Sequence, residues 1–160
     1  MASASRRPCL ELQHAIITAK FGGPLRIVPG FGGVMARIES GGMATFEAVP
    51  MRVALPADSD TGRRELKASV GTVDGQLEQL FRAIGRSTAS CFCVLREYDP
   101  ALINADESVG GFIGQPEILE LANSSYATAA VALTFSNVEL INISIPRLFY
   151  TTANSPGLLS

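Results

Sequence analysis

The chain has 160 residues, 13 of them lysine or arginine, and a formal net charge of -2. This length fits one domain that buries a core of its own without disulfide or metal staples. The weakly acidic balance leaves no basic surface for nucleic acid, so we expect no nucleic-acid partner. Apolar residues make up 47% and charged residues only 18%, which is typical of a β-rich chain that buries much surface, in part against neighbouring subunits.

The three cysteines, Cys9, Cys91 and Cys93, show no spacing typical of a metal site. Cys91 and Cys93 would share one face of a strand, which indicates small packing residues in a reducing compartment. A tetrahedral zinc site wants four ligands, and His14 is the only histidine. The sequence therefore predicts no metal and no cofactor.

No apolar segment of the sequence is long enough to cross a membrane. The longest candidate, residues 126–135, is about half of the roughly 20 residues that a membrane helix needs. Arg6 and Arg7 are not followed by the apolar core of a signal peptide. We therefore expect a soluble protein without a membrane partner.

The N-terminal half of the chain is expected to begin with strands. Residues 1–7 would form a flexible arm ahead of a single β-rich domain, residues 8–160. Three short strands are expected first, at residues 9–17, 24–29 and 34–40. The Phe-Gly-Gly sequences at 21–23 and 31–33 would mark hairpin ends, because glycine adopts positive φ without a Cβ clash.

The segment 44–56 predicts an interrupted strand. Its apolar positions change parity near Pro50, and since proline cannot donate to a strand ladder, we expect a bulge or an edge there. After a turn, Leu66, Ala68 and Val70 alternate strictly with polar residues. This pattern predicts a half-buried antiparallel strand.

One helix is predicted, at about residues 74–84. Four apolar residues recur at helical spacing, namely Leu77, Leu80, Phe81 and Ile84. Asp74 can cap the start of this helix, and Gly85 can end it in the left-handed conformation. The apolar stripe would lie over an open end or a face of the sheet.

The second half of the chain returns to strands. They are expected at residues 90–98, 116–122, 126–135 and 138–146. Residues 99–115 would form a long loop, and Asn123-Ser124-Ser125 the turn of a hairpin. The alanines of 126–135 would equally support a helix, but the tight turn before them and the following Val131, Thr134 and Phe135 favour a strand. The predicted fold class is mainly β, an antiparallel β-barrel or sandwich with one short α-helix.

An acidic run in the middle of the chain superficially matches a calcium loop. Asp58 and Asp60 would be the first two ligands, but Gly62 stands at the third ligand position and Ser69 at the twelfth. Aspartate and glycine are also the usual residues of a hairpin turn. A solvated turn is therefore the favoured interpretation.

Candidate catalytic residues are few. His14 is the only imidazole, and a pairing with Cys91 or Cys93 competes with the simpler reading of those cysteines as strand packing residues. The sequence has no Gly-x-Ser-x-Gly elbow and no glycine-rich phosphate loop. We therefore expect no catalytic residue and no enzyme.

Several apolar side chains fall in predicted loops and in the C-terminal tail. They are Phe21, Phe31, Phe112, Phe149, Tyr150 and Leu158. Two interpretations stay open. These residues close the ends of a barrel or sandwich, or they are the candidate interface residues of a contact between subunits, since aromatic residues are enriched in interface cores.

Motifs across nearly the whole chain follow a recognisable order. The stretch 45–84 contains Phe46, Pro50, Leu55-Pro56 and an acidic run, and it ends in the predicted helix after Val73-Asp74. CLELQHAII with PLRIVPG opens the chain, and PRLFYTTANSPGL closes it. This order resembles a phage tail protein family described only as a domain of unknown function. The chain departs from that family in two places: Val70-Gly71-Thr72-Val73-Asp74 replaces Asp-Asn-Val-Asp, and Ser155 replaces an aromatic residue.

The resemblance implies a structural component of the tail tip of a long-tailed phage, similar in role to distal tail proteins. Such a protein belongs to the virion tail, is assembled in the host cytoplasm, and forms a homo-oligomeric ring, commonly six-fold and sometimes three-fold. Its other partners would be the tail tube, the tape measure and the hub.

Two alternative functions come from other classes. One is a β-sandwich module that binds carbohydrate on a host surface. The absence of tryptophan and the presence of only 3 tyrosines disfavour it, because such sites use aromatic platforms. The other is a tail-associated hydrolase, whose activity would depend on His14.

Overall fold

The computed structural model describes residues 6–56, 64–71, 75–100, 108–109, 112–127 and 129–137. The strands in these ranges are β1 (Arg7–Gln13), β2 (Leu25–Pro29), β3 (Val34–Arg37), β4 (Met43–Val49), β5 (Met51–Ala54), β6 (Glu65–Gly71), β7 (Phe92–Tyr98), β8 (Ser108–Val109), β9 (Ile113–Ala127) and β10 (Ala130–Asn137). The helices are α1 (Ala15–Phe21) and α2 (Gln76–Arg86). The predicted mainly β class is confirmed.

The strands form one mixed sheet in the order β5-β6-β10-β9-β7-β1-β2-β4-β3-β8. Most neighbours are antiparallel, as predicted, but β2 pairs with β4 and β3 pairs with β8 in parallel. The reason lies in the path of the chain. It leaves β2, runs back along β3, and returns as β4 between the two, so that β4 must run in the direction of β2.

A sharp corner at Pro50 connects β4 and β5. These strands are consecutive in the chain, yet β4 pairs with β2 while β5 pairs with β6 at the far end of the sheet order. The Gly71 N–H donates to the Pro50 carbonyl at 2.8 Å and fixes the corner. The sheet thus curls round into a barrel-like shape that no hydrogen-bonded pair closes within the described strands, and the predicted interruption at Pro50 is confirmed.

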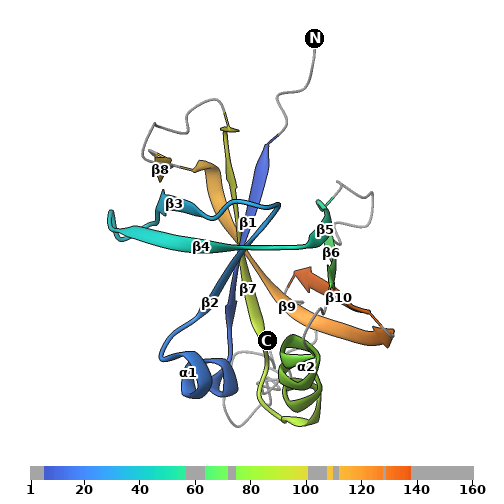
Figure 1. Ribbon diagram of the computed structural model, residues 1–160. Coiled ribbons are helices and arrows are strands. Elements are labelled where there is room, and N and C mark those ends of the chain that lie inside the picture. The colour runs from blue at the N-terminus through green and yellow to red at the C-terminus, as the bar shows by residue number, and fades with distance from the viewer. Residues whose placement is uncertain are drawn as a thin grey trace, which may run out of the picture.

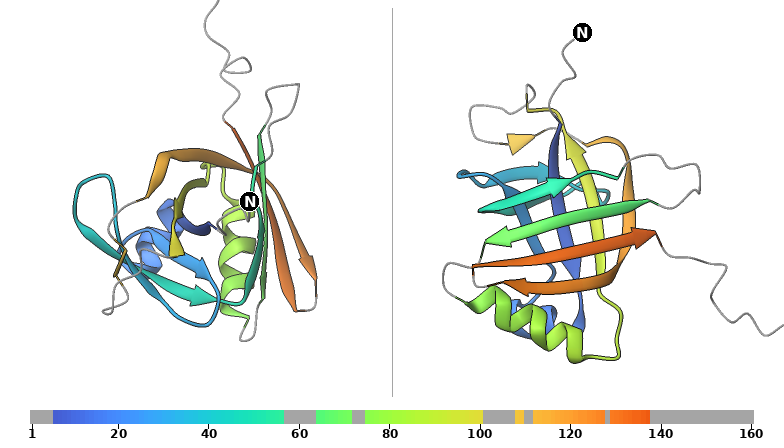
Figure 2. Two further views of the ribbon diagram at one scale, coloured as in Figure 1. Left: turned by 90° about the horizontal axis from the view of Figure 1, so that it is seen from above. Right: turned by 90° about the vertical axis from the view of Figure 1, so that its right-hand side faces the viewer.

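The larger hydrophobic core lies inside this curl. Buried side chains of β1, β2, β6, β7, β9 and β10 fill it, and Leu66, Ala68 and Val70 take part as their alternation predicts. Both helices lie at one end of the molecule (Figure 1). There α2 covers the end of the curl (Figure 2) and inserts Leu80 and Phe81 into the core.

A second, smaller core lies on the opposite face of the central strands. It consists of Cys9, Val28, Val34, Ala36, Ala44, Phe46 and Tyr98. The rings of Phe46 and Tyr98 meet edge to face with centroids 6.2 Å apart. The Tyr98 hydroxyl donates to the Arg37 carbonyl at 2.8 Å. In Figure 1, β4 crosses in front of β1 and β7. The small core lies between the layer of β3 and β4 and the layer of β1 and β7, and it joins these two layers.

Helix α1 replaces the end of the strand predicted at 9–17. The strand stops at Gln13 because the His14 side chain caps a helix, with Nδ1 accepting from the Ile16 N–H at 3.1 Å. Gly22, at a φ of 75°, ends α1 in the left-handed conformation. The first Phe-Gly-Gly sequence is therefore a helix end and not a hairpin end. The second is not a hairpin end either, because it joins β2 to β3, and β4 lies between these two strands.

Helix α2 differs from the prediction only at its ends. It begins after Gly75, whose φ is 72°, and it runs through Gly85 to Arg86. Gly85 thus lies inside the helix and does not end it. Asp74, the predicted cap, lies outside the described residues.

Strand β9 is longer than predicted, and the expected turn at Asn123-Ser124-Ser125 is wrong. These residues pair with Ala132, Leu133 and Thr134 of β10. The register shifts next to them, because Asn123 and Leu121 face successive residues of β10 while Ala122 faces none. The polar residues therefore mark a β-bulge. Before it Leu119 and Leu121 point inward, and after it Ser124 and Tyr126 do. The hairpin turns instead between Ala127 and Ala130.

Several predictions fall outside the described residues. They are the calcium-like run at Asp58 and Asp60, the strand at 138–146, and the tail residues Phe149, Tyr150 and Leu158. The long loop expected at 99–115 is described in part, and it contains β8 and the first residues of β9.

Candidate interaction surface

The outward side of β3 and β4 carries exposed apolar and charged side chains on a regular sheet. Val34 and Ala36 face the small core, so Met35 and Arg37 face outward. On β4 the outward residues are Met43, Thr45 and Glu47. We call these five residues the β3–β4 outer face. Met35 and Met43 are 40% and 45% exposed, although methionine is usually buried.

The strand register orders the outer face into three rows. Arg37 stands opposite Met43 at one end, and Met35 stands opposite Thr45 in the middle. Glu47 lies two residues beyond Thr45, at the other end. Neither Arg37 nor Glu47 makes an ion pair with another residue in the described part of the chain. The face therefore has an unpaired positive end, an apolar middle and an unpaired negative end.

The turn before β3 exposes an aromatic side chain. Phe31 is fully exposed. The turn that carries it is fixed from below, because the Arg7 guanidinium donates to the Gly32 carbonyl at 2.8 Å and to the Pro29 carbonyl at 3.5 Å. A large apolar side chain is thus held in solvent by an ordered backbone.

The other predicted interface residues that the structure describes are placed differently from one another. Phe21, the last residue of α1, is 49% exposed, with the Lys20 ammonium 5.5 Å from its ring centroid. Phe112 is half-buried and packs edge-on against Tyr98 at 6.4 Å. Phe112 therefore helps to close the small core, which is the first of the two interpretations above, while Phe21 and Phe31 present apolar surface to solvent.

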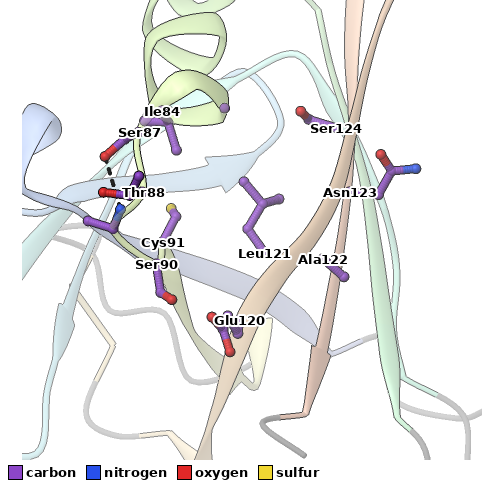
Figure 3. Close-up of a pocket in the computed structure, with 12 residues that line it drawn as sticks. Ile84, Ser87, Thr88, Ser90, Cys91, Glu120, Leu121, Ala122, Asn123 and Ser124 are labelled. Carbon is purple, nitrogen blue, oxygen red and sulfur yellow. Dashed lines mark hydrogen bonds between the residues drawn. The ribbon is translucent and has the colours of Figure 1, made fainter. Parts of the chain in front are cut away.

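A pocket of about 320 Å³ lies between the end of α2 and the middle of β9 (Figure 3). Its polar wall includes Ser90, Cys91, Glu120 and Asn123. Burial raises the pKa of Cys91 to about 11, so its thiol stays protonated at neutral pH. Among the described residues, Glu120 makes no hydrogen bond to a hydroxyl or thiol of the pocket, so it is not placed to activate one of them as a nucleophile.

His14 lies close to this pocket in the fold, but its ring is engaged. Nδ1 accepts from Ile16 N–H, and Nε2 lies 3.2 Å from the Ala89 carbonyl oxygen. This pattern needs a neutral ring with the proton on Nε2. Both nitrogens are therefore tied to backbone groups, which leaves no free nitrogen to act as a base toward Cys91 or Cys93.

A buried cluster of charges between the central strands was not expected from the sequence. Arg96 on β7 and Glu11 on β1 are each 4% exposed, and the Arg96 Nη1 lies 3.2 Å from the Glu11 Oε2. Arg26 on β2 adds a 2.8 Å contact to the same oxygen. Beyond β3, Glu39 receives both remaining nitrogens of the Arg96 fork at 2.7 and 2.8 Å.

The cluster shifts the titration of its members. Burial alone would raise the pKa of Glu11, but hydrogen bonds from Arg26 and Gln13 and the charge of Arg96 outweigh it and hold the pKa below 4.5. The hydrogen bonds from Arg96 likewise lower the pKa of Glu39. Because every charge has a partner of opposite sign, the cluster is a structural clamp between strands.

The described residues include neither a metal-binding cluster nor a membrane-spanning helix. No group of three or more His, Cys, Asp or Glu side chains there could hold a metal ion. Neither helix in the described ranges has the length and apolar character to cross a membrane.

Comparison with known proteins gives one match. No curated protein and no solved structure matches the chain. The sequence model of a family described as a domain of unknown function (DUF1833) matches residues 1–150. The match spans nearly the entire chain and includes both cores, the Pro50 corner and the β3–β4 outer face. The chain therefore belongs to the DUF1833 family.

Proposed function

We propose that this protein is a structural component of a phage tail tip, and that it forms a homo-oligomeric ring between the tail tube or tape-measure end and the hub of the virion. The order of its motifs, which resembles a phage tail protein family, supports this proposal. The observation that carries it is Phe31, an exposed aromatic side chain on a turn that Arg7 holds in place. Its function would be assembly, without catalysis.

The position of Phe31 suits a contact between subunits. Aromatic side chains in interface cores supply large contact areas, and a fixed turn loses little conformational entropy when a neighbour covers it. Strand β5 offers a second contact. Among the described strands it has a hydrogen-bonded neighbour on one side only, and such an edge can pair with a strand of another subunit.

Sedimentation velocity and negative-stain electron microscopy of the full-length chain test the proposal. At tens of micromolar we expect closed rings. Phe31→Ser should shift the protein toward monomers, while Ile118→Ser, which changes a 60% exposed residue of β9 outside the predicted interface, should leave the rings intact. A strictly monomeric wild-type chain over this range would contradict the proposal.

The carbohydrate-binding alternative draws no support from the two tyrosines in the described ranges. Tyr98 is 1% exposed. The ring of Tyr126 is covered by the Arg82 guanidinium, 4.4 Å from its centroid. Neither ring offers the free face on which a sugar would stack.

A further inference from the structure

We infer that the β3–β4 outer face binds the same face of a second copy of this chain across a two-fold axis, with Arg37 of each copy paired to Glu47 of the other. This inference goes beyond the proposed ring and does not depend on it. A two-fold contact uses one patch twice, whereas a ring contact joins two different patches.

The rows of the outer face make it complementary to itself. Consider a two-fold axis that lies in the face and runs across the strands at the level of Met35 and Thr45, which are register partners. This axis exchanges the two ends of the face. It therefore places the positive end of one copy over the negative end of the other, and it places Met35 over Met35.

Charge explains why the occupant is another copy. Arg37 and Glu47 make no ion pair inside the described part of the chain, and the proposed contact gives both of them a partner twice over. An axis along the strands would instead set Arg37 over Met43 and leave all four charges unpaired. Charge pairing selects the first arrangement and its register.

The size of the face sets the expected strength. Two short strands bury less than the roughly 800 Å² per partner of a standard interface. We therefore expect a weak pairing that rises with protein concentration and weakens with salt, because its ion pairs lie at the rim.

Charge reversal provides the main test, by sedimentation equilibrium and native mass spectrometry of the full-length chain. Arg37→Glu and Glu47→Arg should each weaken self-association by more than about tenfold, since each sets like charges over one another. Mixing the two single variants should restore pairing as a mixed dimer. The double variant R37E/E47R should pair with itself as the wild type does. Both positions are exposed, so the fold should survive these changes, and circular dichroism checks this.

Crosslinking locates the axis. Met35→Cys should give a covalent dimer with a short bismaleimide, because the axis sets the two introduced thiols face to face. Ser69→Cys, at an exposed position on β6, is the matched control and should give no covalent dimer. The native thiols do not interfere, since Cys9, Cys91 and Cys93 are all buried.

The outcomes separate this contact from the ring. Rings that form without Met35→Cys crosslinks and ignore charge reversal overturn the two-fold contact and leave the proposed function standing. Dimers that crosslink through Met35→Cys but form no rings support the two-fold contact and overturn the proposed function. A Met35→Cys thiol that resists monofunctional maleimide in a monomer shows that the chain itself covers the face, and this overturns the contact. Failure of the mixed single variants to pair overturns it too.

Discussion

Arg96 donates two hydrogen bonds to the carboxylate of Glu39, from Nε to Oε1 at 2.7 Å and from Nη2 to Oε2 at 2.8 Å. The Arg96 side chain is 3% exposed, whereas that of Glu39 is 43% exposed. A buried cation on a central strand thus reaches out to the segment after β3. The pair ties the layer that carries the β3–β4 outer face to the middle of the sheet.

Replacement of Arg96 by methionine should lower the free energy of unfolding by about 3 kcal/mol, because it leaves Glu11 buried with one arginine fewer. Chemical denaturation measures this change. Arg6→Met removes the exposed pair with Glu97 and is the control; it should cost less than about 1 kcal/mol. Equal losses in the two variants would contradict the clamp.

Acid should weaken the fold through the same cluster. The pKa of Glu39 and that of Glu11 lie below 4.5 in the folded protein. A depressed folded pKa contributes stability above the unfolded pKa, and this contribution is lost as the pH falls through the folded value. The advantage of the wild type over Glu39→Gln should therefore be largest near neutral pH and shrink below about pH 4.5. A pH series of denaturation curves measures it, and a constant difference would argue against this linkage.

Replacement of His14 by alanine should destabilise the protein by about 1 kcal/mol, because it removes the cap of α1. The Ala89 carbonyl would also lose the Nε2 contact. His14→Asn restores a favoured cap but does not reach Ala89, so its stability should lie between those of the wild type and the alanine variant. Thermal denaturation tests this order. If asparagine were no better than alanine, the capping role would be refuted.

Replacement of Gly71 by alanine should disturb the corner at Pro50. An added Cβ would meet the Pro50 carbonyl oxygen at 3.1 Å and its ring at 3.4 Å. We expect a loss of about 1–3 kcal/mol from this overpacking. Gly23→Ala is the matched control, since nothing lies within 4 Å of its added Cβ. Similar stability of the two variants would mean that the corner relaxes freely.

Local patterns in the sequence predicted the elements whose periodicity is regular. The alternation of Leu66, Ala68 and Val70 gave β6, and the spacing of Leu80, Phe81 and Ile84 gave α2. Helix α1 was not predicted, because it has only 7 residues and its cap is histidine, which is not a usual capping residue.

Features that depend on tertiary pairing could not be predicted in this way. The charge cluster draws Glu11, Arg26, Glu39 and Arg96 from separate segments, so no local spacing reveals it. Likewise, Asn123 and Ser124 pair with Thr134 and Leu133 of β10, and this pairing holds them in a strand against their turn propensity. The β3–β4 outer face also depends on the strand register, which places Arg37 opposite Met43.

The central strands serve both cores at once. Leu10 and Leu12 of β1 face the larger core while Cys9 faces the smaller one, and β7 divides Leu95 and Tyr98 in the same manner. Because the two cores share β1 and β7, neither core can unfold while the other stays intact. Heating should melt the molecule in a single calorimetric transition, and a mechanical force on one layer would pass to the other without an internal hinge.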